Sequence, residues 1–336
     1  MRRGINIGVF QSRGKCRKRR AGSTVNPPGR PDFAQTMPMP AASILPDPAR
    51  PVLIAGPTAS GKSALALRIA EAQGRVVVNA DALQVHDAWR VLTARPSPAD
   101  EARAPHLLYG HVPRGADYSV GHWLRELAGI LDRHPDPVIV GGTGLYFTAL
   151  TGGLAAIPPI PAGIRATAAA RLREGGAAAL LAELDAGTAA RIDRRNPARI
   201  RRAWEVLQAT GRGLAAWQDA TDPPLLPLSR AAPLLMMPDR DLLARRIADR
   251  FAAMLRAGAL DEARAALPHW PDTETPGPMP LWTRAIGAAE LIAHLRGQMS
   301  LAEAEAAATL ATRQYAKRQR TWFRNRMAGW PRVAPD

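Results

Sequence analysis

One eight-residue segment constrains the fold of this chain more than any other feature. It reads Gly56-Pro57-Thr58-Ala59-Ser60-Gly61-Lys62-Ser63 and matches G-x-x-x-x-G-K-[ST], a Gly-rich turn that joins a strand to a helix and wraps a phosphate group. A short apolar run, Val52–Ala55, precedes the segment, and good helix formers follow it up to Gly74. This context predicts an α/β fold with a phosphate site at the end of a buried parallel strand.

The residue types of this phosphate loop suit a diphosphate or a triphosphate. The glycines let successive backbone N–H groups point at one oxyanion, and the helix N-terminus adds partial positive charge. Lys62 would neutralise phosphate oxygens, and the Ser63 hydroxyl would ligate Mg²⁺. The loop alone identifies neither the ligand nor the reaction, and a plain Gly-rich turn is the structural alternative.

Apolar runs elsewhere predict the rest of the sheet. Strands are expected at residues 76–80, 107–112, 138–140 and 234–237, the last of these being the final strand. Helices are expected at residues 62–73, 120–133, about 242–257 and 301–326. Strands that alternate with helices indicate a mostly parallel sheet with helices on both faces, like that of P-loop NTPases.

Composition divides the chain into three parts. Residues 51–157 and 233–330 form the α/β core with its C-terminal helices. Between residues 158 and 232 strand-like runs vanish and Ala, Arg and Leu dominate, which predicts an all-helical insertion domain. Residues 1–50 carry ten Lys/Arg and two Asp, half of the net charge of +16, and are expected to be a disordered basic extension. A targeting peptide and a start at Met37 or Met39 are the alternatives.

The charge on the folded part lies in two clusters. Residues 191–202 hold six Arg against one Asp, and residues 313–332 hold seven Lys/Arg and no acid, interleaved with Tyr315, Trp322, Phe323 and Trp330. Basic residues with aromatic neighbours suit an RNA backbone and exposed bases. A solvated helix face above a core of aromatic residues explains the pattern equally well.

Two absences narrow the class of protein. Cys16 is the one cysteine of the sequence, so neither an intramolecular disulfide nor a cysteine-based zinc site is possible, which fits a cytoplasmic protein. No apolar stretch approaches the roughly 20 residues of a membrane span. The chain is therefore expected to be soluble, and we expect a monomer.

Seven further segments follow the phosphate loop in order. They are residues 79–85, 92–96, 105–107, 141–146, 199–206, 284–287 and 312–322, among them Asn-Ala-Asp-Ala-Leu-Gln-Val, Gly-Gly-Thr-Gly-Leu-Tyr and Thr-Arg-Gln-Tyr-Ala-Lys-Arg-Gln-Arg-Thr-Trp. Together with the loop they resemble the signatures of the tRNA dimethylallyltransferase (IPP transferase) family over residues 51–330. Two departures are His86 and Ala288, where the family usually has Tyr, and both are expected to loosen contacts near tRNA.

The resemblance implies a prenyl transfer. A dimethylallyl group would pass from dimethylallyl diphosphate to N6 of adenine-37, beside the anticodon, in tRNAs that read codons beginning with U, with release of diphosphate. Asp81 is the candidate base for the N6 proton, with a magnesium ligand or a helix N-cap as alternatives. Lys62, Ser63 with Mg²⁺, and Thr143 would stabilise the leaving group. Arg240 or Arg246 would bind the diphosphate, although a solvated arginine remains the alternative for Arg246.

The resemblance also implies a tRNA surface. The target base must leave its stack to be modified, and the anticodon stem-loop is the expected partner. The helical insertion at residues 158–232 would supply part of this surface. The implied contacts are Asp81, Ala82, Leu83, Gln84, Thr143, Arg165, Ala198, Arg199, Ile200, Arg201, Arg202, Arg284, Ala285, Ile286 and Gly287. For Arg165 a plain surface role is the alternative.

Three other functions fit parts of the sequence. A small-molecule kinase also uses a phosphate loop but needs no long basic insertion. An isopentenyltransferase that acts on free adenine nucleotides would share the donor site. A non-enzymatic RNA-binding module would need neither Lys62 nor Asp81.

Overall fold

The computed structural model describes residues 39–40, 45–271 and 279–334. The predicted disordered extension lies outside these ranges except for residues 39–40 and 45–50, and so does Cys16. None of the helices within the described ranges combines the length and apolar character that a membrane span requires.

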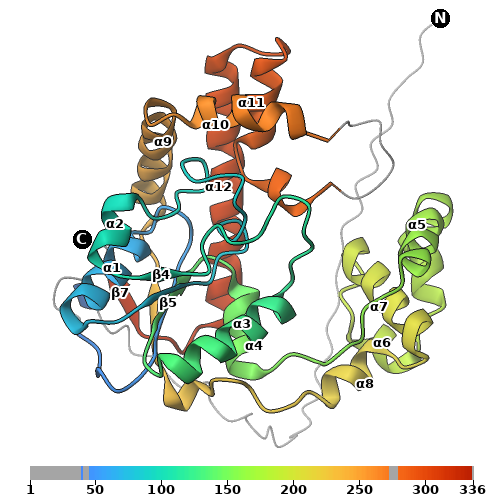
Figure 1. Ribbon diagram of the computed structural model, residues 1–336. Helices are drawn as coiled ribbons and strands as arrows, with labels where there is room; N and C mark the ends of the chain where they lie inside the picture. Colours follow the sequence, from blue (N-terminus) through green and yellow to red (C-terminus); the bar gives the residue numbers. More distant parts are fainter. Residues whose placement is uncertain (1–38, 41–44, 272–278, 335–336) are drawn as a thin grey trace, which may run out of the picture. The chain divides into compact units, whose positions relative to one another are not determined.

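The centre of the molecule is a parallel sheet (Figure 1). Its strand order is β1-β7-β6-β2-β5-β3-β4, and every neighbouring pair is parallel. The strands are β1 Met39–Pro40, β2 Val52–Ala55, β3 Val77–Asn79, β4 His106–Leu107, β5 Val138–Gly141, β6 Ala232–Met236 and β7 Arg332–Ala334. This confirms the α/β prediction of a parallel sheet flanked by helices.

Helices make up most of the remaining described structure. They are α1 Lys62–Gln73, α2 Pro98–Arg103, α3 Val120–Arg133, α4 Gly144–Gly152, α5 Ala162–Ala182, α6 Ala186–Arg191, α7 Pro197–Thr210, α8 Leu214–Asp219, α9 Arg240–Arg256, α10 Ala259–Ala266, α11 Ala288–Leu295 and α12 Leu301–Arg326, with short 3-10 turns η2 Leu228–Arg230, η3 Leu267–His269 and η4 Leu281–Arg284. Side-chain capping explains several boundaries: Ser119 and Ser300 each close a reciprocal capping box at the start of α3 and α12. Helices α5 to α8 form a group of their own between α4 and β6 (Figure 1).

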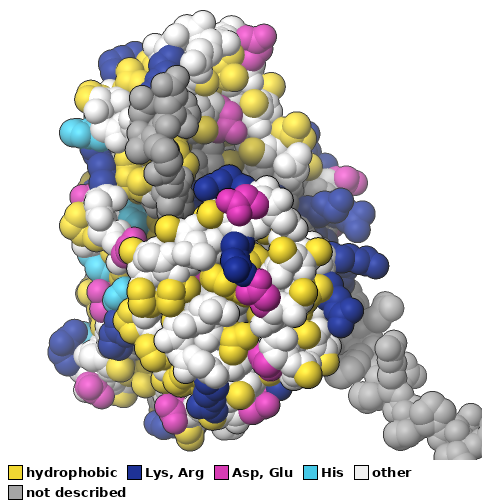
Figure 2. Space-filling model, turned by 90° about the vertical axis from the view of Figure 1, so that its right-hand side faces the viewer, with side chains coloured by type: hydrophobic (Ala, Val, Ile, Leu, Met, Phe, Trp, Pro, Cys, Tyr) yellow, Lys and Arg dark blue, Asp and Glu magenta, His cyan; other side chains and the backbone are white. Residues whose placement is uncertain are grey.

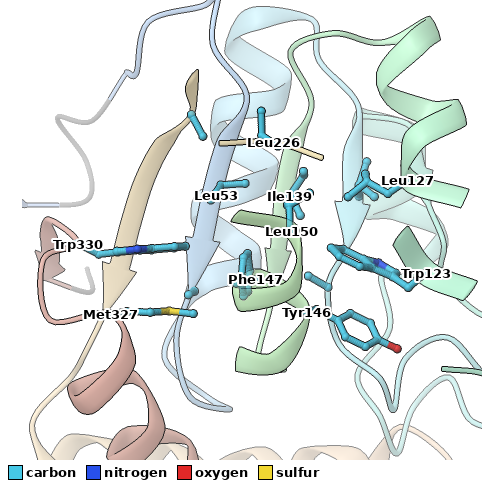
Figure 3. Packing of buried hydrophobic residues seen from close by; sticks show 14 of the residues in the cluster. Leu53, Trp123, Leu127, Ile139, Tyr146, Phe147, Leu150, Leu226, Met327 and Trp330 are labelled. Carbon is cyan, nitrogen blue, oxygen red and sulfur yellow. The ribbon is translucent and has the colours of Figure 1, made fainter. Parts of the chain in front are cut away.

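The two faces of the sheet bury alternate residues of each strand. Leu53 and Ile139 face a cluster built from α3, α4 and the end of α12. Figure 3 shows Phe147 near its middle, with Trp123 on one side and Trp330 on the other. Val52, Ile54 and their neighbours on β3 and β5 face α1 instead. Because successive side chains of a strand point to opposite faces, a run of continuous apolar residues is what a sheet covered on both sides requires.

Several predicted boundaries are right and others are wrong. The ranges of β2, α1, α3 and α12 are as expected. The strand expected at 107–112 stops at Leu107, because Leu108 and Gly110 have positive φ angles of 62° and 55° and turn the chain away. The expectation that 234–237 is the last strand is wrong, since β7 follows at the C-terminal end. The sheet also begins before residue 51, because β1 pairs with β7.

Candidate active site

The site is assembled where β2, β3, β5 and β6 end. In a parallel sheet the loops after neighbouring strands meet along the carboxyl edge, which is where ligands bind. The phosphate loop follows β2, Asp81 follows β3, the Gly-Gly-Thr-Gly segment follows β5, and α9 follows β6. The sheet therefore brings together residues as far apart in the chain as Ser60 and Arg246, which are separated by 186 positions.

The phosphate loop is wound as its glycines require. Gly61 has a φ angle of 93° and caps α1 without any side-chain hydrogen bond, so amides of the first helical turn remain available to an anion. Gly56 leaves no space for a side chain, since a Cβ there would lie 2.7 Å from the carbonyl oxygen of Met236. Ala59 also has a positive φ angle, 60°.

A buried glutamine holds this loop in place. The Thr58 N–H donates to Oε1 of Gln319 over 2.9 Å, and Nε2 of Gln319 donates to the carbonyl oxygen of Gly142 over 2.9 Å. Gln319 thus ties α12 to the loops after β2 and β5. The sequence pattern identified the segment 312–322 through its basic residues, but it missed this contact because an isolated buried glutamine has no periodic signal.

Lys62 lies inside a strongly desolvated charge cluster. Its Nζ is 3.4 Å from the carbonyl oxygen of Pro57. Burial lowers the pKa of Lys62 to about 8, while the Asp81 carboxylate raises it and Arg250 lowers it to smaller extents. A diphosphate in the loop would add negative charge to that of Asp81 and stabilise the charged form of this lysine.

The arginines of α9 differ in their relation to the loop. Nη1 of Arg246 donates to the carbonyl oxygen of Ser60 over 3.5 Å. Arg250 lines a cavity with Asp81 and Thr58, and another with Arg246 and Gly61.

Arg240, the expected diphosphate ligand, is the first residue of α9. It is exposed at the first position of α9, about 15 Å along the helix axis from Arg250 at 1.5 Å per residue. Burial, and then the nearby Arg240, lower the pKa of Arg320. Arg246 thus contacts the loop, and Arg250, which sequence reasoning missed, lines both of these cavities beside it. Arg240 lines neither cavity, and its role as a diphosphate ligand stays a prediction.

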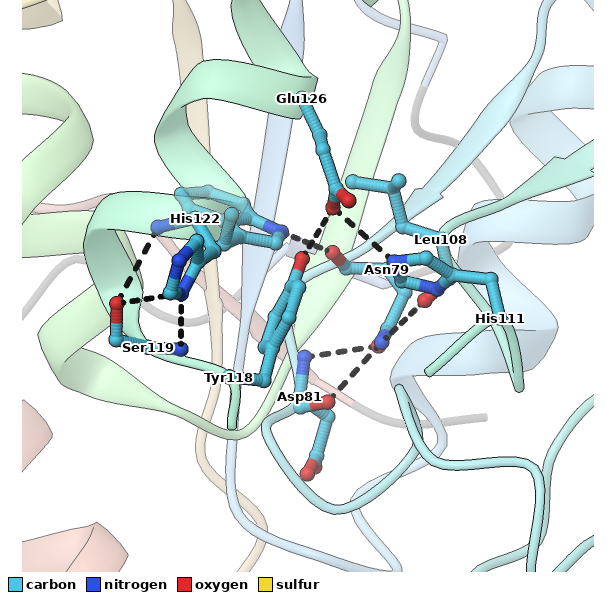
Figure 4. Close-up of polar contacts among 9 residues, drawn as sticks. Asn79, Asp81, Leu108, His111, Tyr118, Ser119, His122 and Glu126 are labelled. Atoms are coloured by element: carbon cyan, nitrogen blue, oxygen red, sulfur yellow. Dashed lines mark hydrogen bonds and ion pairs between the residues drawn. The ribbon is translucent and has the colours of Figure 1, made fainter. Parts of the chain in front are cut away.

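Asp81 is held at the start of a tight turn (Figure 4). Its Oδ1 accepts the N–H of Leu83 over 3.0 Å, so the side chain closes a turn and no helix begins there, contrary to the N-cap alternative. The Ala82 N–H donates to Oγ1 of Thr143 over 2.9 Å. Gln84 donates from Nε2 to the carbonyl oxygens of Thr93 and Ala94, at 2.9 and 2.8 Å.

One cavity joins Asp81 to the phosphate loop. Its polar wall includes Asp81, Thr58 and Arg250, while much of the remainder is apolar. The lining consists of Thr58, Asp81, Leu83, Gln84, Leu92, Thr93, Ile247, Arg250, Phe251, Met254, Ile286, Thr312 and Tyr315. We call this space the site cavity; a carboxylate, a cationic wall and an apolar wall around it suit a substrate that is part anion and part hydrocarbon.

A basic groove runs along α12. It is lined by Arg199, Gln314, Lys317, Arg318, Thr321, Trp322, Asn325 and Arg326. Arg326 lies over the Trp322 ring and Arg318 over the Tyr315 ring, at 5.9 and 5.7 Å. The groove thus combines cations and aromatic rings from α12 with Arg199 of α7, the combination expected for single-stranded RNA. Figure 2 shows Lys and Arg side chains spread over one face of the molecule, with several gathered along an edge.

The predicted arginine segment opens α7. Arg199 and Arg202 are exposed, whereas Ile200 is 1% exposed and belongs to the core of this helical group. Arg201 and Arg202 approach the buried carboxylate of Glu205 at 3.4 and 3.9 Å. Burial raises the pKa of Glu205, and Arg201, Arg202 and Arg165 oppose this. Arg165 thus lies near the segment, while Ile200 has no exposed side chain for RNA.

The segment 284–287 lies beside the site cavity. Ile286 lines it and Arg284 is exposed, but Ala285 is buried. Gly287 has a φ angle of 93°, and a Cβ there would lie 2.7 Å from the Phe251 ring. Ala285 and Gly287 therefore shape the wall rather than offer side chains.

Both departures from the family pattern are buried. His86 is 1% exposed, neither of its ring nitrogens has a hydrogen-bond partner among the described residues, and burial lowers its pKa. Ala288 is fully buried in a cluster with Trp89 and Trp282. Neither side chain reaches the surface, so neither can contact tRNA directly. The expectation that they loosen contacts near tRNA stays a prediction.

The residues around the loop fit a magnesium ion that is shared with a ligand. Among the described residues no group of three or more His, Cys, Asp or Glu could hold a metal. Mg²⁺ is commonly bound by one or two protein oxygens, with phosphate oxygens and waters completing its shell. The exposed Ser63 hydroxyl on the first turn of α1 can be one such oxygen.

Proteins similar to this chain in sequence and fold are named as transferases that act on tRNA. The chain is 64% identical to a tRNA dimethylallyltransferase of Cereibacter sphaeroides over 90% of its length and 95% of that protein. It is 66% identical to one of Dinoroseobacter shibae, over 89% of this chain and 99% of that one. The crystal structure of the full-length tRNA isopentenylpyrophosphate transferase of Bacillus halodurans superposes with a TM-score of 0.57 and 27% identity, covering 85% of this chain and 90% of that chain. The IPP transferase family model matches residues 84–326, and the chain belongs to this family.

Proposed function

We propose that this protein transfers a dimethylallyl group from dimethylallyl diphosphate to N6 of adenine-37, beside the anticodon, in tRNAs that read codons beginning with U. The observation that carries the proposal is the site cavity, which joins Asp81 to Thr58 and Arg250 beside the phosphate loop. A base and a diphosphate site on one cavity are what transfer from an allylic diphosphate to an amine needs. The names of the relatives support the same reaction.

The chemistry follows from these positions. The N6 nitrogen attacks C1 of the donor, a new C–N bond forms, and the C–O bond breaks so that its electron pair leaves with the diphosphate. An exocyclic amine of adenine is a poor nucleophile, so Asp81 accepts the N6 proton as the bond forms. Leu83 and Ile286, with the apolar side chains of α9, exclude water from the allylic carbon.

The negative charge that develops on the leaving diphosphate must be stabilised by the protein in the transition state. Lys62, Arg246 and Arg250 supply cations at the loop, and amides of the first turn of α1 donate hydrogen bonds. Ser63 would hold Mg²⁺, which neutralises diphosphate oxygens when bound. Thr143 acts from the other side by holding the turn that carries Asp81.

The tRNA would lie along the basic groove. Lys317, Arg318 and Arg326 on α12, with Arg199 on α7, would neutralise backbone phosphates, and Tyr315 marks the point where α12 also lines the site cavity. The target adenine would leave its stack to enter the cavity. We also propose that the protein acts on tRNA as a monomer in the cytoplasm.

The test is transfer of labelled dimethylallyl groups. Purified protein is incubated with labelled donor, Mg²⁺ and unmodified tRNA that carries adenine after the anticodon, with AMP and ATP as parallel acceptors. Label on tRNA alone supports the proposal. Label on AMP would favour an enzyme of free nucleotides, and ATP turnover without prenyl transfer would favour a kinase.

A further inference from the structure

Asn79 is the last residue of β3 and is completely buried. Its side-chain amide makes hydrogen bonds to both the N–H and the carbonyl oxygen of Asp81. Oδ1 accepts the N–H of Asp81 over 2.8 Å, and Nδ2 donates to the carbonyl oxygen of Asp81 over 3.0 Å. Nδ2 also donates to the carbonyl oxygen of Leu108 over 3.0 Å. Figure 4 shows the Asn79 amide bonded to the backbone of Asp81, with the Asp81 carboxylate pointing away from it.

The orientation of the amide follows from its partners. Two carbonyl oxygens require a donor, and one N–H requires an acceptor, so only one assignment of O and N satisfies all three contacts. The backbone of Asn79 is fixed in turn, because Nε1 of Trp123 donates to its carbonyl oxygen over 2.7 Å. Trp123 is fully buried and stacks on Tyr146 at a centroid distance of 4.6 Å.

These contacts leave one carboxylate oxygen of Asp81 for chemistry. Asn79 holds the N–H and the carbonyl of Asp81, and the Leu83 N–H holds Oδ1. Among the described residues none donates a hydrogen bond to Oδ2, which lies 3.0 Å from the position a Cβ would take on Gly142. Bases act efficiently only when the accepting atom is held within hydrogen-bond reach of the proton.

We infer that Asn79 is a positioning residue for the transfer reaction, which acts by holding both peptide groups of Asp81 so that Oδ2 faces the acceptor amine. The inference rests on the proposed function. Asn79 lies behind the turn and touches neither the phosphate loop nor the basic groove in any hydrogen bond of the described residues. Its loss therefore affects the chemical step and leaves substrate binding intact.

Two variants of Asn79 test this. Asn79→Ala removes all three side-chain hydrogen bonds, and Asn79→Ser leaves a hydroxyl that can make fewer of them, so it provides a milder lesion if the alanine variant folds poorly. Leu127→Ala is the matched control, because Leu127 is fully buried in the same cluster as Trp123 and has no polar contact with Asp81. Single-turnover rates at saturating substrates, both KM values and thermal unfolding are measured for each protein beside wild type and Asp81→Ala.

We expect Asn79→Ala to slow the single-turnover rate roughly 10- to 100-fold, since a misplacement of about 1 Å can cost a factor of that size. Both KM values should stay near those of wild type, and Asn79→Ser should fall between. Leu127→Ala should lose thermal stability and keep the rate. A normal rate in both Asn79 variants while Asp81→Ala is inactive, a loss confined to KM, or an equal loss of rate in Leu127→Ala would each overturn the inference. Absence of transfer by wild type would instead overturn the proposed function, and the inference with it.

Discussion

The phosphate loop and the arginine segment at residues 198–202 both serve anions, but they are built in opposite ways. The loop is shaped mainly by its backbone: Ala59 and Gly61 have positive φ angles, and Gln319 accepts the N–H of Thr58. Lys62 adds a cationic side chain, whose pKa burial lowers to about 8. The arginine segment is made of side chains, with Arg199 and Arg202 exposed on one turn of α7. The fixed backbone geometry of the loop therefore determines how it binds an anion, whereas the arginine segment attracts an anion through the charge of its side chains.

This difference has a functional meaning. A diphosphate that leaves during the reaction needs donors fixed in a desolvated place, where each is strong. A tRNA backbone that must be bound, moved and released is better served by solvated cations whose contribution depends on salt. We therefore expect damage near the loop to appear in the chemical step or in donor binding, and damage to the arginine segment to appear in salt-dependent tRNA affinity.

The largest effect is expected at Asp81. In Asp81→Asn the Oδ1 contact with Leu83 can persist, but the proton acceptor is lost, so the rate of transfer should fall about 10²- to 10⁴-fold. Donor and tRNA affinities should change little. Asp117→Asn, at an exposed aspartate, is the control, and rapid-quench measurement of single turnovers is the assay. A variant that keeps most of the rate would exclude Asp81 as the base.

Lys62 should control donor affinity and its pH dependence. Lys62→Met keeps the length of the side chain and removes a charge-assisted hydrogen bond of about 1.5–3 kcal/mol, so dimethylallyl diphosphate should bind roughly 10- to 100-fold more weakly. In wild type the pKa of about 8 means that Lys62 is charged below that pH and increasingly neutral above it. Donor affinity should therefore fall as pH rises through 8 in wild type, and this part of the decline should be missing in Lys62→Met. Calorimetric titrations from pH 7 to 9.5 would reveal an identical pH dependence in both proteins if this reasoning fails.

The phosphate loop and its flanking elements could be predicted from the sequence, because their signals are local. The loop, β2 and α1 are local: a glycine pattern, an apolar run and a helix C-cap at Gly74 specify them within 25 residues. The strand β7 is three residues long and pairs only because distant strands are already in place, so it has no local signal. Arg250 and Gln319 enter the site through the packing of α9 and α12, and helical periodicity cannot say which of several arginines faces a loop 190 residues away.

Single substitutions in the arginine segment should weaken tRNA binding only modestly, and the size of the loss should depend on the salt concentration. Arg199→Ala and Arg202→Ala should each weaken tRNA binding severalfold at low salt and reduce the slope of log affinity against log salt by about 0.7–0.9. The single-turnover rate at saturating tRNA should be unchanged. Arg133→Ala removes one exposed charge from α3 and serves as the control. Filter-binding titrations over a range of salt concentrations provide the measurement, and an unchanged slope in both variants would place the tRNA elsewhere.

The smallest effect is expected at Arg240, which the sequence suggested as a diphosphate ligand. Its guanidinium is exposed at the start of α9, and its electrostatic neighbour is the cation Arg320 rather than the loop. Arg240→Ala should therefore leave donor affinity unchanged, and it could relieve repulsion from Arg320. Arg250→Ala is the matched variant on the same helix, and it should weaken donor binding because Arg250 lines two cavities that loop residues also line. Calorimetry with dimethylallyl diphosphate separates the two, and a loss at Arg240 equal to that at Arg250 would mean that α9 shifts toward the loop when the donor binds.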